Sequence, residues 1–115
     1  MDNETIPLDS SSSDAVEPMY ILSLLNNELM SSSWKLINKD YNIGRSSENN
    51  IILDDITVSR KHALISLSRE NVRIIDNNST NGIYVNNEIT GDCELKSGDK
   101  IQIGKYLLLL TEVTK

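Results

Sequence analysis

The sequence predicts an all-β protein in which short strands form a sandwich or a barrel. Turn residues divide its 115 residues into short apolar segments, and no window of a dozen residues combines a helical period with helix caps. Apolar and polar residues alternate over residues 72–74 and 101–103, which is typical of half-buried strands. The regular turn spacing between these segments favours packed β-sheets over a helical fold.

The expected strands follow one another from residue 19 to residue 111. They cover residues 19–25, 33–37, 40–44, 50–53, 62–68, 72–76, 83–86, 88–89, 100–103 and 105–111. Turns are expected at residues 38–40, 69–71 and 86–87, and Gly104 joins the last two strands. The best helical candidate, residues 22–30, is interrupted by two asparagines. Aromatic residues make up only 4% of the chain and none is Phe, so the core should be mainly aliphatic.

The acidity of the chain is concentrated in its first 18 residues. The formal net charge is -6, and residues 1–18 carry five acidic residues and no Lys or Arg. The same segment contains a run of serines at 10–13 and two prolines. Such a composition buries too little apolar surface to offset its ordering entropy. We therefore expect a disordered tail over residues 1–18, with or without a role beyond solubility, and one domain over residues 19–115.

Several functional classes are disfavoured by composition. An acidic chain is not expected to bind nucleic acid or an anionic membrane, because such binding needs clustered Lys and Arg. Because Cys93 is the single cysteine, the chain cannot form an internal disulfide or a Cys-based zinc site. We expect Cys93 to lie in a turn and its thiol to be unreactive. No metal-ligand spacing, cofactor motif or signal peptide is recognisable, so we expect a cytoplasmic protein without cofactor or metal. Ser59 and His62 suggest a hydrolase, but the sequence has no nucleophile elbow, so we do not expect an enzyme.

Three polar turns carry the most distinctive side chains. They span residues 44–46, 57–62 and 77–82. Together they contain two guanidinium groups, an ammonium group, hydroxyls and carboxamides, nearly all of which donate hydrogen bonds. This set is typical of a site for an oxyanion such as phosphate. Asn, Ser and Gly are also the residues that ordinary turns use. On composition alone, ordinary polar turns therefore explain these three segments at least as well as an oxyanion site does.

The order and spacing of these turns resemble the forkhead-associated (FHA) domain, a phosphothreonine-binding β-sandwich. The matching stretches are Gly44-Arg45, Ser59-Arg60-Lys61-His62, Ser79-Thr80-Asn81-Gly82, residues 84–86, residues 95–99 and residues 101–104. The resemblance covers the chain from about residue 20 to its end. It implies a sandwich of about eleven strands in two sheets. Ile83 departs from the family pattern, in which Thr is common at that position.

The resemblance also implies a role for each turn residue. The residues expected to bind the phosphopeptide are Arg45, Ser59, Arg60, Thr80 and Asn81. We expect Arg45 to make the strongest contact, because a guanidinium group binds two phosphate oxygens in a fixed geometry. Ser59 and Thr80 would donate to the phosphate, Arg60 would add positive charge, and Asn81 would bind the peptide backbone.

Three further residues of the turns are expected to be structural. Gly44 and Gly82 allow positive φ or close chain approach. His62 would brace the loop that carries Ser59.

We therefore expect a phosphothreonine-peptide-binding signalling module that acts downstream of a Ser/Thr protein kinase. Its partners would be phosphothreonine-containing proteins. The alternative is a phosphorylation-independent adaptor that binds a partner through a sheet face.

The tail is a candidate internal ligand. Small FHA proteins with an N-terminal tail resemble the actinobacterial regulators of 2-oxoglutarate metabolism, in which a phosphorylated tail threonine binds its own domain. The tail here contains one threonine, Thr5, and lacks the paired threonines of that group. Thr5 is therefore the candidate phosphorylation site.

Overall fold

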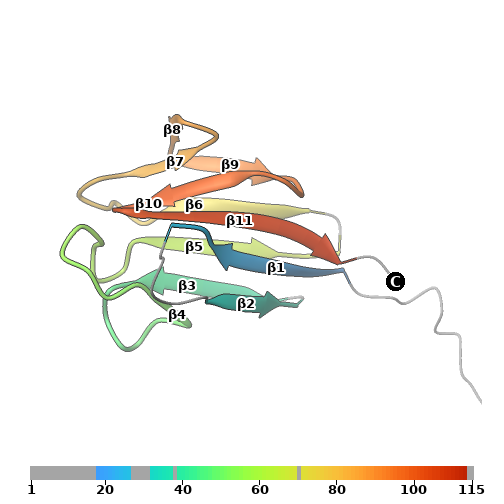
Figure 1. Cartoon of the computed structure of the whole chain (residues 1–115), viewed down its shortest axis with the longest axis horizontal. Helices are drawn as coiled ribbons and strands as arrows, with labels where there is room; N and C mark the ends of the chain where they lie inside the picture. Colours follow the sequence, from blue (N-terminus) through green and yellow to red (C-terminus); the bar gives the residue numbers. More distant parts are fainter. Residues whose placement is uncertain (1–17, 27–31, 38, 70, 114–115) are drawn as a thin grey trace, which may run out of the picture.

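The computed structural model describes residues 18–26, 32–37, 39–69 and 71–113, which form eleven strands and no helix (Figure 1). The strands are β1 (Met19–Leu24), β2 (Ser33–Leu36), β3 (Asp40–Gly44), β4 (Ile51–Ile52), β5 (Ala63–Leu67), β6 (Val72–Asp76), β7 (Ile83–Val85), β8 (Glu88–Thr90), β9 (Asp92–Leu95), β10 (Lys100–Ile103) and β11 (Tyr106–Val113). The all-β prediction is confirmed. The expected tail, with Thr5, lies outside the described residues except for Pro18.

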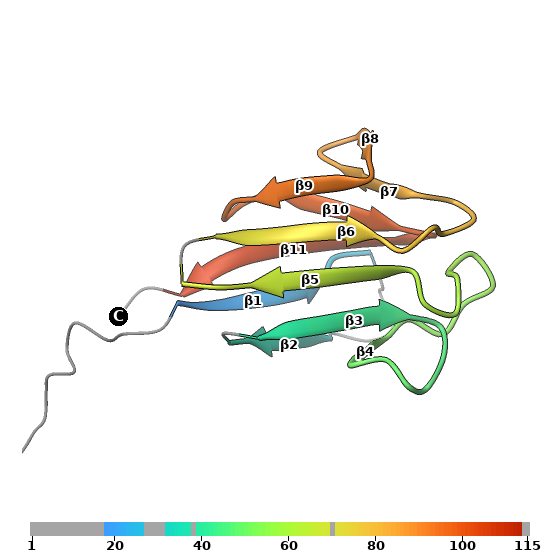
Figure 2. The same ribbon diagram turned by 180° about the vertical axis from the view of Figure 1, so that it is seen from behind.

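The strands form two sheets that pack face to face (Figures 1 and 2). The six-stranded sheet has the order β2-β1-β11-β10-β7-β8, and the five-stranded sheet has the order β4-β3-β5-β6-β9. The strand pairs are antiparallel except for β3 and β4, in which Ile43 lies beside Ile51 in a parallel register. The chain therefore forms the two-sheet sandwich that the turn spacing indicates.

Alternation along most strands sends one set of side chains between the sheets, whereas β8 contains no buried residue. In β10, for example, Ile101 and Ile103 are fully buried whereas Lys100 and Gln102 are exposed. The buried hydrophobic residues are Leu, Ile, Val and Ala, together with Tyr41. The expectation of an aliphatic core is thus confirmed for the residues that the structure describes.

One strand was not expected. The sequence predicts a turn at Cys93, between the acidic residues Asp92 and Glu94, but residues 92–95 form β9, which pairs with β6. Asp92 faces outward and forms an ion pair with Arg73 of β6 at 2.8 Å. Cys93 is half-buried and packs against the core, so its predicted position in a turn is wrong. The alternation of acidic side chains with Cys93 and Leu95 is itself a strand pattern.

The loops that carry the distinctive residues lie at one end of the sandwich. This loop end comprises the β3–β4 loop (45–50), the β4–β5 loop (53–62), the β6–β7 loop (77–82) and the β10–β11 turn (104–105) (Figure 1). At the opposite end, Met19 at the start of β1 pairs with Val113 at the end of β11. The sandwich therefore separates the loop end from the described chain ends.

Candidate functional site

Backbone hydrogen bonds fasten the β3–β4 loop to the β4–β5 loop. The amide of Arg45 donates to the carbonyl of Ser59 at 2.9 Å, and the amide of Ser46 donates to the carbonyl of Arg60 at 3.2 Å. Gly44 packs so closely that a Cβ atom at this position would overlap the Arg60 carbonyl oxygen. Glycine is thus required here by close approach of the two chains.

Asn49 adds a buried connection between the same two loops. The residue is 7% exposed, and its Nδ2 donates to the carbonyl oxygens of Ser46 at 2.8 Å and Arg60 at 2.7 Å. Asn49 is not among the residues predicted from the sequence. An asparagine in a polar turn gives no local signal of burial, because the carbonyl of Arg60 that it binds lies on another loop.

His62 connects the β4–β5 loop to the β6–β7 loop. The imidazole is fully buried. Its Nδ1 accepts a hydrogen bond from the Ser59 amide at 3.0 Å, so Nε2 carries the proton and donates to the Gly82 carbonyl at 2.7 Å. His62 is therefore held as the neutral Nε2–H tautomer and braces the backbone on both sides of the candidate site.

The β6–β7 loop has its own internal support. The Ser79 hydroxyl donates to Asp76 at 2.5 Å and accepts from the Gly82 amide at 2.9 Å. Asn78 and Gly82 adopt positive φ values of 55° and 80°. These bonds shape a tight loop that presents Thr80 at the loop end.

Two hydrogen bonds between side chains and backbone connect Thr80 and Asn81 of the β6–β7 loop to the β4–β5 loop. The amide of Thr80 donates to Ser59 Oγ at 3.0 Å, and Asn81 Nδ2 donates to the carbonyl of Thr57 at 2.9 Å. Because Ser59 Oγ accepts this bond, its own hydroxyl proton remains available to a ligand. The carbonyl oxygen of the Asn81 carboxamide accepts no hydrogen bond from the described residues.

The Arg45 side chain is partly fixed and partly free. Its Nε donates to the Val58 carbonyl at 2.9 Å, while its two terminal amino groups make no hydrogen bond within the described chain. Among the residues that the structure describes, no carboxylate pairs with Arg45 or Arg60. The loop end therefore carries two guanidinium groups that have no carboxylate partner among the described residues, on the β3–β4 loop and on the β4–β5 loop that also carries the Ser59 hydroxyl. This donor set suits an anion.

The structure thus brings the three predicted turns together. Arg45, Ser59, Thr80 and Asn81 belong to one network of loop contacts. The Arg60 side chain is exposed, while its carbonyl oxygen belongs to the network. Gly44, His62 and Gly82 lie in supporting positions. No group of three or more metal-ligating side chains occurs among the described residues, and none of their segments forms a helix that could cross a membrane.

A second group of side chains borders this network. Asp55 accepts hydrogen bonds from the Thr57 amide at 2.9 Å and the Thr57 hydroxyl at 2.6 Å, and it forms an ion pair with Lys105 at 3.1 Å. The Thr57 bonds and then Lys105 lower the pKa of Asp55 from 3.8 to about 2. The hydrogen bond to Asp55 raises the pKa of Lys105. This pair was not predicted from the sequence, because its members lie on different loops.

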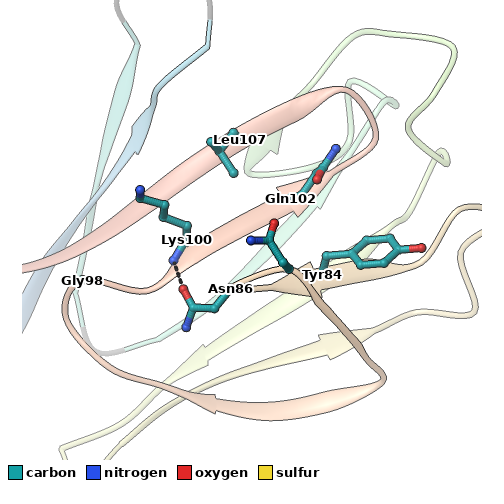
Figure 3. Close-up of a pocket in the computed structure, with 7 residues that line it drawn as sticks. Tyr84, Asn86, Gly98, Lys100, Gln102 and Leu107 are labelled. Atoms are coloured by element: carbon teal, nitrogen blue, oxygen red, sulfur yellow. Dashed lines mark hydrogen bonds between the residues drawn. The ribbon is translucent and has the colours of Figure 1, made fainter.

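Two surface depressions differ in their relation to this network. One, of about 490 Å³, lies on the outer face of the six-stranded sheet, where Lys100, Gln102 and Leu107 line it (Figure 3). It contains none of the predicted binding residues. The other, of about 340 Å³, includes Asn81 and Gly82 in its lining and so adjoins the network.

Comparisons with known proteins agree with this geometry. The model of the FHA domain family matches residues 41–104. The "Oxoglutarate dehydrogenase inhibitor" of Corynebacterium efficiens is 46% identical over 66 residues, which are 57% of this chain and 46% of that protein. The "Glycogen accumulation regulator GarA" of Mycobacterium tuberculosis is 44% identical over 66 residues, 57% of this chain and 41% of that one. The chain thus spans less than half of these relatives.

Solved structures show the same sandwich. An FHA domain determined in a structural and functional analysis of phosphothreonine-dependent FHA domain interactions aligns with a TM-score of 0.78 at 28% identity, covering 84% of this chain and 99% of that one. The FhaA FHA domain, complexed with the intracellular domain of Rv3910, aligns with a TM-score of 0.73 at 30% identity, covering 79% and 98%.

Proposed function

This chain belongs to the FHA domain family, and on that premise we propose that it is a phosphothreonine-peptide-binding signalling module acting downstream of a Ser/Thr protein kinase. The ligand binds at the loop end of the sandwich. Its partners are phosphothreonine-containing proteins, and it regulates them by binding.

The juxtaposition of Arg45 and Ser59 carries this proposal. The bond from Arg45 Nε to the Val58 carbonyl orients the guanidinium group and leaves its two amino groups for a ligand. The Ser59 hydroxyl proton is available in the same network. A phosphothreonine carries about -1.5 to -2 charges at pH 7 and three acceptor oxygens, which match these donors.

The remaining binding residues have complementary roles. Arg60, which has no carboxylate partner in the described part of the chain, adds a second positive charge. The Thr80 hydroxyl donates to a phosphate oxygen. Asn81 is anchored through Nδ2 to Thr57, so its carboxamide oxygen has a defined orientation toward an incoming peptide amide. An extended peptide is thereby held beside its phosphothreonine.

The geometry around Ser59 argues against catalysis. His62 Nδ1 accepts from the Ser59 backbone amide, and Nε2 donates to Gly82, so neither ring nitrogen can take the proton of the Ser59 hydroxyl. The relatives are named as an inhibitor of oxoglutarate dehydrogenase and a regulator of glycogen accumulation. We propose that this chain is likewise a non-catalytic regulator.

The tail remains a candidate internal ligand through Thr5. β1 begins at the end of the sandwich opposite the loops, so the tail has to run along the sandwich to reach Arg45. The eight residues of β11 span roughly 26 Å. The segment between Thr5 and Met19 extends to about 45 Å when stretched, which is sufficient. Tethering gives an effective concentration on the order of millimolar, so even a weak site would be mostly occupied by its own phosphorylated tail.

One observation favours the alternative, a phosphorylation-independent adaptor. The outer face of the six-stranded sheet carries the exposed side chains of Tyr84 and Ile89 and the depression lined by Leu107. Pull-downs from extract with and without phosphatase treatment separate the two functions. An adaptor of this kind keeps its partner after phosphatase, whereas the proposed module loses it.

Peptide binding tests the main proposal directly. Fluorescence anisotropy should show binding of a phosphothreonine peptide and not of its unphosphorylated form. Arg45→Ala should weaken binding tenfold or more, because hydrogen bonds to charged groups contribute about 1.5–3 kcal/mol each. Lys61→Ala, a matched loss of one exposed charge on the β4–β5 loop, should have a small effect. Unchanged affinity in Arg45→Ala would show that the site lies elsewhere.

Kinase treatment tests the tail. Phosphorylated wild-type protein should bind the peptide more weakly than untreated protein, and Thr5→Ala should abolish that difference. Equal affinities before and after phosphorylation of Thr5 would reject self-binding.

A further inference from the structure

Asn81 and Gly82 form the only Asn-Gly sequence in the 115 residues of the chain. Asparagine is chemically labile, and it is most labile before glycine, because glycine has no Cβ atom to obstruct attack on the carboxamide. In this reaction the Gly82 amide nitrogen loses its proton to base and bonds to Cγ of Asn81. The bond from Cγ to Nδ2 breaks, and Nδ2 takes up a proton and leaves as ammonia. Water then opens the succinimide ring at either carbonyl group, which leaves aspartate or isoaspartate at position 81.

The position of this pair gives water and base access to the reacting groups. Asn81 is exposed and Gly82 is half-buried, in the β6–β7 loop at the loop end (Figure 1). Asn50 is a useful comparison within the same chain. It is also exposed, but it precedes Ile51, whose branched side chain hinders the same attack. The sequence and the exposure therefore single out Asn81 for this chemistry.

Two hydrogen bonds restrain the reacting groups in the folded loop. The Gly82 amide donates to Ser79 Oγ at 2.9 Å, so the proton that base must remove is engaged. The Ser79 hydroxyl donates its own proton to Asp76, which leaves an oxygen lone pair for Gly82. Asn81 Nδ2 donates to the Thr57 carbonyl at 2.9 Å, so the carboxamide is tied to the β4–β5 loop. The reaction has to release the Gly82 proton and the carboxamide from these bonds.

The product cannot replace asparagine in the candidate site. A carboxylate has no N–H group to donate, so the bond to the Thr57 carbonyl is lost. The new negative charge lies next to Thr80 in the chain, in the network that has to receive a phosphate carrying about -1.5 to -2 charges. Isoaspartate also lengthens the backbone by one methylene group. This change displaces the Gly82 carbonyl, which accepts from His62 Nε2 at 2.7 Å.

We propose that Asn81 is a spontaneous deamidation site, that Ser79 restrains the reaction while the loop is closed, and that the product no longer binds a phosphothreonine peptide. The first two parts depend on the loop alone, and the loss of binding rests on the proposed function. A bound peptide adds a hydrogen bond to the Asn81 carboxamide, so an occupied site is modified more slowly. Deamidation therefore inactivates unoccupied domains first.

Peptide mapping by mass spectrometry measures the modification in the full chain at mildly alkaline pH. Chain unfolded in guanidinium chloride should be modified at Asn81 faster than folded chain, and faster than at Asn50. Folded Ser79→Ala should be modified about twofold to tenfold faster than folded wild type, the factor that one hydrogen bond contributes. Ser97→Ala is the matched control, because Ser97 Oγ also accepts from a backbone amide, that of Glu112 at 2.9 Å. It should react at the wild-type rate.

Fluorescence anisotropy measures the effect on binding. Modified and unmodified protein are separated by ion exchange, and the modified protein should bind a phosphothreonine peptide at least about tenfold more weakly. Asn81→Asp, which carries the same charge without the extra methylene group, should also bind more weakly than wild type. Saturating phosphothreonine peptide should slow the modification of wild type, and its unphosphorylated form should not.

The outcomes separate this inference from the proposed function. Equal rates in Ser79→Ala and Ser97→Ala overturn the restraint by Ser79, and an Asn81 that stays intact in the unfolded chain overturns the modification site. Unchanged affinity of the modified protein overturns the effect on binding, and equal rates with the two peptides overturn the protection by ligand. If unmodified wild type does not bind the phosphothreonine peptide, the proposed function fails, while the modification rates still decide the deamidation site.

Discussion

Asn49 offers the sharpest test of how the loop end is held together. Its carboxamide donates to the carbonyl oxygens of Ser46 and Arg60, and Asn49→Ala removes both bonds. Each hydrogen bond contributes about 0.5–1.5 kcal/mol net. Both carbonyls keep a second donor, since the Ser46 amide binds Arg60 and the Asn49 amide binds Ser46, each at 3.2 Å. We therefore expect a loss of about 1–2 kcal/mol, the lower part of the range for two bonds.

A second substitution distinguishes hydrogen bonding from packing. Asn49→Asp keeps the shape but places a second acceptor against two carbonyl oxygens in a site that is 7% exposed. It should cost at least about 1 kcal/mol more than Asn49→Ala, because acceptors that face acceptors remain unsatisfied. Asn77→Ala is the control, because Asn77 is exposed and its side chain makes no hydrogen bond within the described chain.

Urea unfolding followed by circular dichroism measures the free energy of unfolding, and anisotropy measures phosphopeptide affinity. Affinity should fall together with stability in Asn49→Ala, because Arg45 lies on the same loop. The reasoning is refuted if Asn49→Ala is as stable as the Asn77 control, or if Asn49→Asp is no less stable than Asn49→Ala.

Further predictions concern the site and its supports. Arg45→Lys should still weaken phosphopeptide binding in anisotropy, since lysine keeps the charge but lacks the planar fork; affinity equal to wild type would count against a bidentate contact. Binding should also weaken below about pH 6, where the phosphate takes up its second proton, and a flat profile to pH 5 would argue against a dianionic ligand. Asp55 has a folded-state pKa of about 2, lowered from 3.8, so its stabilising contribution should be complete above pH 3.8 and disappear as the pH falls toward 2. Urea unfolding should therefore show a gap between wild type and Asp55→Asn that closes over this range, and a constant gap would contradict it. Gly44→Ala should destabilise the fold by at least about 1–3 kcal/mol in the same assay, because the added methyl overlaps the Arg60 carbonyl; unchanged stability would refute that constraint.

Most of the fold could be predicted because apolar segments are short and some of them alternate. β10 places apolar residues on one face and polar residues on the other, and residues 72–74 of β6 show the same pattern in the sequence. β9 was missed because Asp92 and Glu94 look like turn residues when they are considered alone. Their place in a strand depends on β6, which supplies Arg73 as the partner of Asp92.

The predicted binding residues could be named, but the contacts that join them could not be predicted. Asn49 and Asn50 are adjacent asparagines, yet Asn49 is buried and Asn50 is exposed. The difference arises from the Arg60 carbonyl, which only the folded β4–β5 loop brings to Asn49. The Asp55–Lys105 pair has the same origin, since the two residues meet only after the sandwich has formed.

The pairing of Met19 with Val113 has a practical consequence for handling this domain. Residues at which the described chain enters and leaves the sandwich are neighbours, as insertion into a host protein requires. If this domain were inserted into an exposed loop of another protein, its loop end would point away from that protein. For the same reason, an affinity tag or a biosensor linkage attached beyond Met19 or Val113 leaves the loop end free to bind its ligand.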